Sequence, residues 1–344
     1  MTDAVLSERR GRALFVTLDR PASLNALDRA MVSSIHRALM DGAADPQVDR
    51  IVIDGAGERA FCAGGDVVAL YHAGRAGSSD WEGFFRDEYR MNQAIARLPV
   101  DYVALLDGVT MGGGVGLSIH GRYRVANERT LFAMPETGIG LIPDVGGTHA
   151  LALLPGEIGT WLALTGARLR AADCGYAGIA THFVPLDRLA LLRELMADGE
   201  EDAGTILDTL DASAGDSALS ALREGIDFHF AHDRVEDIQA SLADGDDWAR
   251  AQHEVIARMS PTSLKLSLKG VRMARGGTIE AALRTEYRMV CAIKNGRDFY
   301  EGVRAQVIDK DKSPLWSPAT LAEVDDTMVA SYLREPATGD LEFD

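Results

Sequence analysis

Two acidic residues, Glu136 and Asp144, stand eight positions apart in a segment that is otherwise apolar and interrupted by glycine and proline. This punctuation is typical of a folded loop, so we expect both carboxylates to face one pocket. Burial and mutual repulsion raise the pKa of at least one carboxyl group in such a pair, which suits it to proton transfer near neutral pH. The residues alone also allow a plainer interpretation, in which both are helix caps or turn carboxylates.

Two glycine-rich segments, Ala60–Asp66 and Asp107–Gly116, each follow an expected strand and precede an expected helix. Glycine lets a ligand approach the main chain closely, and the first turn of a helix has free N–H groups. Two such peptides facing each other would form an oxyanion hole for the enolate or tetrahedral oxyanion of a thioester. Taken singly, either segment is more often a simple tight turn.

Other catalytic motifs do not fit the sequence. No glycine-rich loop ends in Gly-Lys-Ser/Thr, and Gly112, Gly114 and Leu117 miss the spacing of a dinucleotide-binding loop. A serine nucleophile elbow would need its second glycine one place earlier, so we expect Ser118 and His120 to be ordinary helix residues. The eight histidines show no metal-ligand spacing, and we expect neither a metal nor a separate cofactor.

The elements that must position these residues alternate between strands and helices, as in α/β proteins. Expected strands are 13–18, 50–53, 102–106, 123–126 and 130–133, with turn residues at Asp54-Gly55 and Asp107-Gly108. Expected helices are 30–40, 66–73, 81–98, one from about 148, and 157–164. We therefore predict a core with the active site over residues 1–185 and a helical C-terminal region over 186–344.

The C-terminal half carries fewer chemical signals. Asp187–Asp247 is acidic and helix-prone, which favours a solvated connecting face. Ser260-Pro261 predicts a capped helix start. An apolar stripe at helical spacing is expected to be core or a subunit contact: Ile279, Leu283, Tyr287 and Val290.

The composition is that of a folded enzyme, with 47% apolar and 25% charged residues among 344. A net charge of −17 disfavours binding to nucleic acid or to an anionic membrane. Three widely spaced cysteines predict reduced thiols, and no apolar run approaches the length of a membrane span. On these grounds we expect a cytoplasmic protein.

The acidic segment and both glycine segments, in this order, together with Leu18–Leu27, resemble the crotonase (enoyl-CoA hydratase/isomerase) superfamily. The resemblance implies an α/β spiral of ββα units with a helical C-terminal region and an acyl-CoA substrate. It also implies an oxyanion hole formed by the backbone N–H groups of Gly65 and Gly113. Homo-oligomers are common in this superfamily, so a homo-oligomer is possible here.

Within the superfamily the chain is more similar to the 3-hydroxyisobutyryl-CoA hydrolases of valine degradation. The strings that carry this likeness span most of the chain: 84–89, 111–116, 132–147, 178–184, 301–305 and 308–314. The likeness implies a thioesterase in which coenzyme A is part of the substrate. It assigns catalysis to Glu136 and Asp144, and substrate contact to these two residues together with Glu88 and Gly113.

Departures from the hydratases support this assignment. Gly116 stands where a hydratase carries a second glutamate, and Asp144 stands where hydratases usually have glycine. Glu136 could attack the thioester to form an anhydride, or it could activate water together with Asp144. Two other functions stay open: a hydratase or isomerase with Glu136 as the base, and a non-catalytic acyl-CoA-binding protein. Candidates for the CoA phosphates are Arg20, Arg29 and Arg59.

Overall fold

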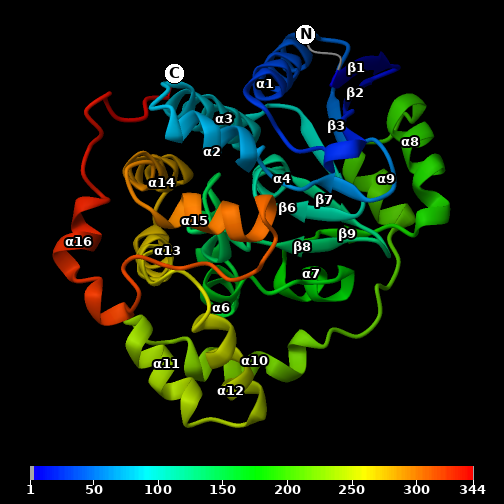
Figure 1. Cartoon of the computed structure of the whole chain (residues 1–344). Coiled ribbons are helices and arrows are strands. Elements are labelled where there is room, and N and C mark those ends of the chain that lie inside the picture. Colours follow the sequence, from blue (N-terminus) through cyan, green and yellow to red (C-terminus); the bar gives the residue numbers. More distant parts are fainter. Residues whose placement is uncertain (1–3, 344) are drawn as a thin grey trace. The chain divides into compact units, whose positions relative to one another are not determined.

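The computed structural model describes residues 4–343, which group into two compact units (Figure 1). Among the described residues, the first unit takes in 4–65, 90–133 and 168–221, and the second takes in 66–89, 134–167 and 222–343. These units are defined by contacts in the folded chain, and each combines segments that are far apart in the sequence. They do not test the boundary expected near residue 185, which stays a prediction.

The first unit contains two sheets (Figure 1). The larger has the strand order β1-β2-β3-β5-β7-β9, in which only the β1–β2 pair is antiparallel. Its strands are β1 (Val5–Arg10), β2 (Ala13–Leu18), β3 (Arg50–Gly55), β5 (Asp101–Leu106), β7 (Tyr123–Ala126) and β9 (His182–Phe183). The smaller sheet is parallel and contains β4 (Ala60–Cys62), β6 (Val109–Met111) and β8 (Leu131–Ala133). Along the chain, a strand of the larger sheet is repeatedly followed by one of the smaller sheet, which is the ββα order expected.

The sequence located the buried strands well. The bounds of β2 and β7 match the predicted ones, and β2 was easy to locate because its residues are almost continuously apolar and buried. The turn predicted at Asp54-Gly55 is wrong, since both residues continue β3 and pair with Thr17 and Leu18 of β2. The charged edge strand β1 was not predicted, because alternation is weak in a strand that is mostly exposed.

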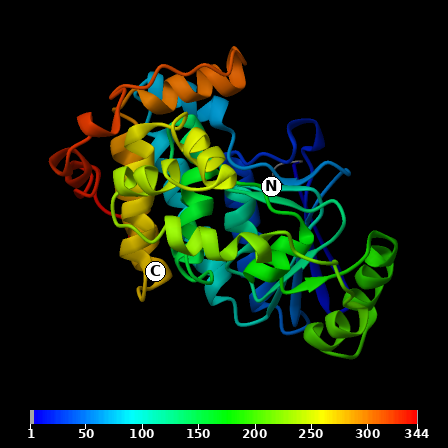
Figure 2. The same cartoon turned by 90° about the horizontal axis from the view of Figure 1, so that it is seen from below.

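Helices α8 (Leu189–Asp198) and α9 (Ala203–Leu210) pack against the larger sheet. They lie beside each other in Figures 1 and 2, where they are green. Their apolar side chains join those of the strands in one buried cluster that includes Phe15, Val52, Leu192, Met196, Ile206 and Leu207. A solvated connecting face is therefore wrong for this part of Asp187–Asp247, because the acidic residues occupy only one side of amphipathic helices. The other helices of this unit are α1 (Arg29–Ala44), α4 (Gly113–Ser118) and α7 (Ala171–Ala177).

The second unit is built from helices. They are α2 (Val67–Arg75), α5 (Gly147–Ala152), α6 (Ile158–Thr165), α11 (Val235–Ala243), α12 (Asp247–Ile256), α13 (Pro261–Ala274), α14 (Ile279–Ile293), α15 (Asp298–Val303) and α16 (Asp326–Ser331). Two more, α3 (Asp80–Arg97) and α10 (Leu219–His229), have residues in both units. Every element described after β9 is helical, so the predicted fold class is confirmed.

Local signals in this helical part are also confirmed. The Ser260 hydroxyl accepts from the Ser263 N–H and caps α13, which has proline in its first turn. The predicted stripe on α14 is fully buried. Among residues 4–343, none of the helices combines the length and the apolarity of a membrane span.

The three cysteines, Cys62, Cys174 and Cys291, are buried, and none of them forms a disulfide within residues 4–343. Burial raises the pKa of the Cys174 thiol to about 12 and that of Cys291 to about 11. That these cysteines stay reduced in solution remains a prediction.

Candidate active site

The two glycine segments lie at the carboxyl ends of neighbouring strands of the smaller sheet. Strand β4 leads into Gly64 and Gly65, and β6 leads into Gly112, which precedes α4. Because β4 and β6 pair in parallel, both turns come to the same edge of the sheet. Gly64 and Gly112 have φ angles of +117° and +49°, which side chains rarely adopt.

The main chains of these turns approach closely. A Cβ on Gly64 would lie 3.5 Å from the Met111 carbonyl oxygen and 3.7 Å from the Gly113 nitrogen. A Cβ on Gly114 would lie 2.2 Å from the Cys62 carbonyl oxygen, so only glycine fits there. The structure thus brings Gly65 and Gly113 to adjacent turns, and Gly113 occupies the first turn of a helix, where N–H groups have no acceptor within the helix.

Neighbouring residues fix the turn at Gly64 and Gly65. The Leu27 N–H donates to the Gly64 carbonyl at 2.8 Å, and Leu27 forms a parallel bridge with Gly65. In the second unit, the Asp66 carboxylate accepts from the Ala69 N–H and caps α2.

The second unit holds the acidic residues. Glu136 is the first residue of a 3-10 helix, η2 (Glu136–Ile139), and Asp144 lies in the loop between η2 and α5. Glu88 lies on α3 and Glu286 on α14. All four side chains are buried, with at most 4% of each residue exposed.

Asp144 accepts a hydrogen bond at 2.7 Å from the Tyr89 hydroxyl to its Oδ2. Burial raises the pKa of Asp144 to about 7, while the bond from Tyr89 acts in the opposite direction. Near neutral pH this carboxyl group therefore exchanges its proton readily, which is what a general base or acid requires.

Glu136 and Glu88 are both influenced by Asp144. Burial raises the pKa of each glutamate well above the ordinary value, and the charge of Asp144 raises it further. We call Glu88, Glu136 and Asp144 the carboxyl cluster. In the structure, burial acts on the pKa of both Glu136 and Asp144, and the charge of Asp144 acts on Glu136, while the catalytic role of the pair stays a prediction.

Two oxygens of the carboxyl cluster have unused hydrogen-bonding capacity. Glu136 Oε2 and Glu88 Oε1 are buried, and neither has a hydrogen-bond partner among the residues described. A buried polar atom without a partner costs on the order of 1 to 3 kcal/mol, and one in a native fold calls for an explanation. A substrate that offers polar groups to both oxygens would supply it.

The loop that carries Glu136 is closely packed. Gly140 ends η2 at φ +72°, and a Cβ there would lie 2.2 Å from the Asp298 carbonyl carbon at the start of α15. On the other side, Gly302 of α15 leaves no room for a Cβ against the Ile139 backbone. Helix α15 thereby fixes the position of η2.

Sequence reasoning missed Tyr89 and Glu286. Glu286 accepts hydrogen bonds from the Gly146 and Thr148 backbone N–H groups that follow Asp144. A signal was present, because this glutamate adjoins Tyr287 within the apolar stripe of α14, where an acidic residue is unusual.

Several residues singled out from the sequence have structural contacts. The Arg20 guanidinium donates to the Ala26 carbonyl at 2.9 Å and lies 3.4 Å from Asp28, while Arg59 is exposed. The Ser118 hydroxyl donates to the Gly114 carbonyl within α4, as expected of a helix residue. The role of Arg20, Arg29 and Arg59 toward CoA stays a prediction.

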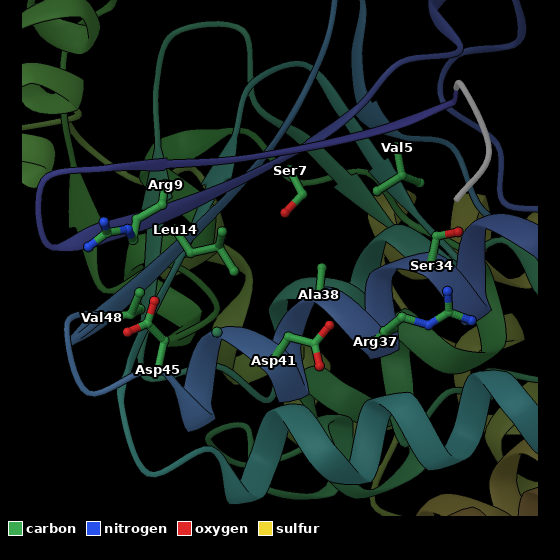
Figure 3. A pocket seen from close by; sticks show the side chains of 11 residues that line it. Val5, Ser7, Arg9, Leu14, Ser34, Arg37, Ala38, Asp41, Asp45 and Val48 are labelled. Carbon is green, nitrogen blue, oxygen red and sulfur yellow. The ribbon is translucent and has the colours of Figure 1, made fainter.

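A cavity of about 180 Å³ lies in the first unit. Figure 3 shows the side chains that line it, which come from the β1–β2 hairpin, from α1 and from the segment after α1. Leu14 from the hairpin and Ala38 from α1 line it, and charged side chains such as Arg37 and Asp41 lie around it. None of the predicted site residues lines this cavity, so we do not assign the chemistry to it.

Comparison with known proteins decides the family. The sequence pattern described as "Enoyl-CoA hydratase/isomerase" matches residues 13–333. The chain belongs to the enoyl-CoA hydratase/isomerase family.

Its crotonase fold is confirmed by two solved structures that it resembles. A carnitinyl-CoA dehydratase from Mycobacterium thermoresistibile has 40% identity and a TM-score of 0.94, with 100% of this chain and 99% of that chain covered. An enoyl-CoA hydratase from Rhodobacter sphaeroides has 42% identity and a TM-score of 0.92, with 99% and 100% covered.

Curated relatives in this family are named 3-hydroxyisobutyryl-CoA hydrolase, mitochondrial. The protein of Rattus norvegicus is 47% identical, with 99% of this chain and 91% of the relative covered. The protein of Homo sapiens is 43% identical, with 99% and 92% covered. The predicted likeness to this hydrolase subfamily is confirmed.

The expectation of a cytoplasmic location is wrong by this comparison, since the curated relatives are named as mitochondrial. Reduced thiols, an acidic net charge and a lack of long apolar runs do not distinguish the cytosol from the mitochondrial matrix.

Proposed function

We propose that this chain is an acyl-CoA thioester hydrolase that converts 3-hydroxyisobutyryl-CoA and water into 3-hydroxyisobutyrate and CoA. The observation that carries the proposal is the carboxyl cluster, in which Glu136 and Asp144 are buried and the charge of Asp144 raises the pKa of Glu136. The hydrolase name of relatives 43–47% identical supports the substrate and a role in valine degradation. The partner is a small molecule, and no cofactor besides the CoA of the substrate is proposed.

In this proposal the backbone N–H groups of Gly65 and Gly113 donate to the thioester carbonyl oxygen. Negative charge develops on this oxygen when a nucleophile adds to the carbonyl carbon, so the two donors bind the transition state more strongly than the substrate. Loss of one such donor typically costs about 3 to 4 kcal/mol of barrier. The adjacent turns at Gly64 and Gly112 support this pairing.

Glu136 supplies the nucleophile or activates it. In one route its carboxylate attacks the carbonyl carbon, the CoA thiolate leaves, and water opens the resulting anhydride. In the other route Glu136 and Asp144 remove a proton from water, which attacks directly. The thiol leaving group, with a pKa near about 8.5 if it behaves like cysteine, needs little help from an acid. Asp144, with a pKa of about 7, can take up the proton of water in either route.

A single turnover in isotopically labelled water separates these routes. Mass spectrometry of the peptide that contains Glu136 detects label in the enzyme if an anhydride forms. Label that appears only in the free acid supports direct attack by water. Both results agree with a hydrolase, and they differ in the role of Glu136.

Glu88 is proposed to bind the 3-hydroxyl group of the substrate, because its Oε1 is buried without a partner among residues 4–343. A site that hydrogen-bonds a hydroxyl group rejects the analogue that lacks it. The kcat/KM for isobutyryl-CoA should therefore be lower than that for 3-hydroxyisobutyryl-CoA by a factor of roughly 100 or more. Equal rates for the two thioesters would remove Glu88 from this role.

The second candidate is a hydratase or dehydratase, since the two solved structures named above carry such titles. Gly116 argues against it, because it supplies no second carboxylate to position water across a C=C bond. The deciding experiment supplies crotonyl-CoA and 3-hydroxyisobutyryl-CoA separately and follows thiol release and loss of the enoyl absorbance. Thiol release from the second without hydration of the first supports the hydrolase, and the reverse pattern supports the hydratase.

A non-catalytic acyl-CoA-binding protein is the remaining alternative. It predicts that Glu136→Ala leaves the slow turnover of thioester unchanged. The hydrolase proposal predicts a loss of roughly 1,000-fold or more in kcat, as for removal of a nucleophile or general base.

A further inference from the structure

The turn that follows Asp144 has an unusual backbone. Val145 and Gly146 have φ angles of +56° and +76°, so two successive residues are left-handed. Valine is β-branched and rarely adopts this conformation. A strained turn of this kind persists only where surrounding contacts hold it. The position of Asp144 therefore depends on what anchors the turn.

Glu286 supplies the anchor from α14. Its Oε2 accepts from the Gly146 N–H at 2.7 Å, and its Oε1 accepts from the Thr148 N–H at 2.9 Å and from the Thr148 hydroxyl at 2.5 Å. Glu286 is completely buried, and hydrogen bonds to a carboxylate are stronger than those between neutral groups. Within the turn, the Gly147 N–H also donates to the Asp144 carbonyl at 2.6 Å.

Asp144 is thus held at two points. The Tyr89 hydroxyl orients its carboxylate, and the contacts of Glu286 fix the backbone on its C-terminal side. Both oxygens of Glu286 are engaged by donors of the turn, which makes it an acceptor for the main chain and leaves it poorly placed to serve as a third catalytic acid.

We infer that Glu286 is a positioning residue for thioester hydrolysis, acting through the turn 144–148 on the Asp144 carboxylate. This inference rests on the proposed function. Glu286 is expected to touch no atom of the substrate, so its loss should lower kcat while KM changes little. Its effect should also vanish once the Asp144 carboxylate has been removed.

The test is a double-mutant cycle with Glu286→Gln and Asp144→Ala. Glutamine keeps the volume of the side chain but turns an NH2 group toward a backbone N–H, so at least one anchoring bond is lost. We expect Glu286→Gln to lower kcat roughly 30-fold or more with less than about a threefold change in KM, as for loss of precise orientation. In the Asp144→Ala background the same substitution should cost less than about threefold. Glu254→Gln, an exposed change on α12, is the matched control and should leave both constants unchanged.

The outcomes are distinguishable. The inference is overturned, while the hydrolase proposal stands, in either of two cases. In the first, Glu286→Gln is fully active. In the second, the factor by which Glu286→Gln lowers kcat is the same with and without the Asp144→Ala substitution. If Asp144→Ala is as active as the unmodified chain, the role of Asp144 fails, and the inference fails with it.

Thr148→Val covers the case in which Glu286→Gln does not fold. It removes only the hydroxyl donor and leaves both N–H donors in place. We expect a loss in kcat of roughly 3- to 10-fold that disappears in the Asp144→Ala background. An equal loss in both backgrounds would overturn the inference.

Discussion

At the scale of single residues, the main feature is that one tyrosine hydroxyl and one aspartate influence the whole carboxyl cluster. The charge of Asp144 raises the pKa of Glu88 and Glu136, and the bond from Tyr89 lowers the pKa of Asp144. Protons in such a cluster are lost in steps that belong to the group as a whole. The pH dependence of the reaction therefore reports on these contacts.

The first prediction concerns this pH dependence. If Asp144 must be ionised to act, kcat/KM rises with pH through a region near 7. Tyr89→Phe removes the donor that stabilises the ionised form, so the pKa of Asp144 rises and the acidic limb moves to higher pH. A pH–rate profile of both proteins measures the shift.

Tyr102→Phe is the control for this substitution. Tyr102 is equally buried, but its hydroxyl donates to the Leu117 carbonyl and to no carboxylate in the contacts described. It should lose some stability while the acidic limb stays where it is. A shift of the same size in both variants would mean that Tyr89 acts through stability alone.

At the scale of elements, the short helix α4 must start directly against strand β4 for the two glycine turns to meet. The sequence indicated the glycines and the strand-turn-helix order, and both are confirmed. It did not indicate β4 or β6, because each lies inside a glycine-rich segment whose composition predicts a turn. The closeness of Gly114 to Cys62 depends on that pairing and became visible only in the folded chain.

Gly114→Ala is the second prediction. The added Cβ would meet the Cys62 carbonyl oxygen at 2.2 Å, so the start of α4 must shift and Gly113 must shift with it. Misplacement by about 1 Å can cost roughly 100-fold, so we expect kcat to fall by that order. Steady-state kinetics on protein shown to be folded by circular dichroism provides the measurement.

Gly175→Ala provides the contrast. Gly175 lies in helix α7 with nothing within 4 Å of an added Cβ, so alanine should be neutral or stabilise by about 0.5 to 1 kcal/mol. Activity retained by Gly114→Ala, or lost equally in both variants, would contradict the role given to the close approach at Cys62.

At the scale of the whole molecule, the motifs and the buried strands could be predicted, whereas the grouping of distant segments could not. Glu136, Asp144 and Glu88 were identified from one segment and a resemblance, and the structure brings them together. The anchoring contacts between Glu286 and residues 146–148 span about 140 positions, a separation that no local pattern encodes. The acidic helices after residue 187 were misjudged for a related reason, because net charge conceals an apolar face.

The third prediction tests that apolar face. Leu192 is buried in the cluster between α8 and the larger sheet, whereas its neighbour Leu191 is 45% exposed. Leu192→Ala should lower the free energy of unfolding by about 2 to 5 kcal/mol, and Leu191→Ala by less than about 0.5 kcal/mol. Denaturant titration measures the free energy of unfolding of both variants. Equal losses would mean that this segment is a solvated connecting face after all.

The burial of all three cysteines has a practical consequence for measuring turnover. A thiol in a buried, apolar setting carries almost no thiolate and reacts slowly with disulfide dyes. Such a dye added to the working enzyme would therefore count released coenzyme A with little background from the polypeptide. Once the protein is denatured, the same reagent would titrate three sulfhydryls per chain and so report the enzyme concentration in the same cuvette.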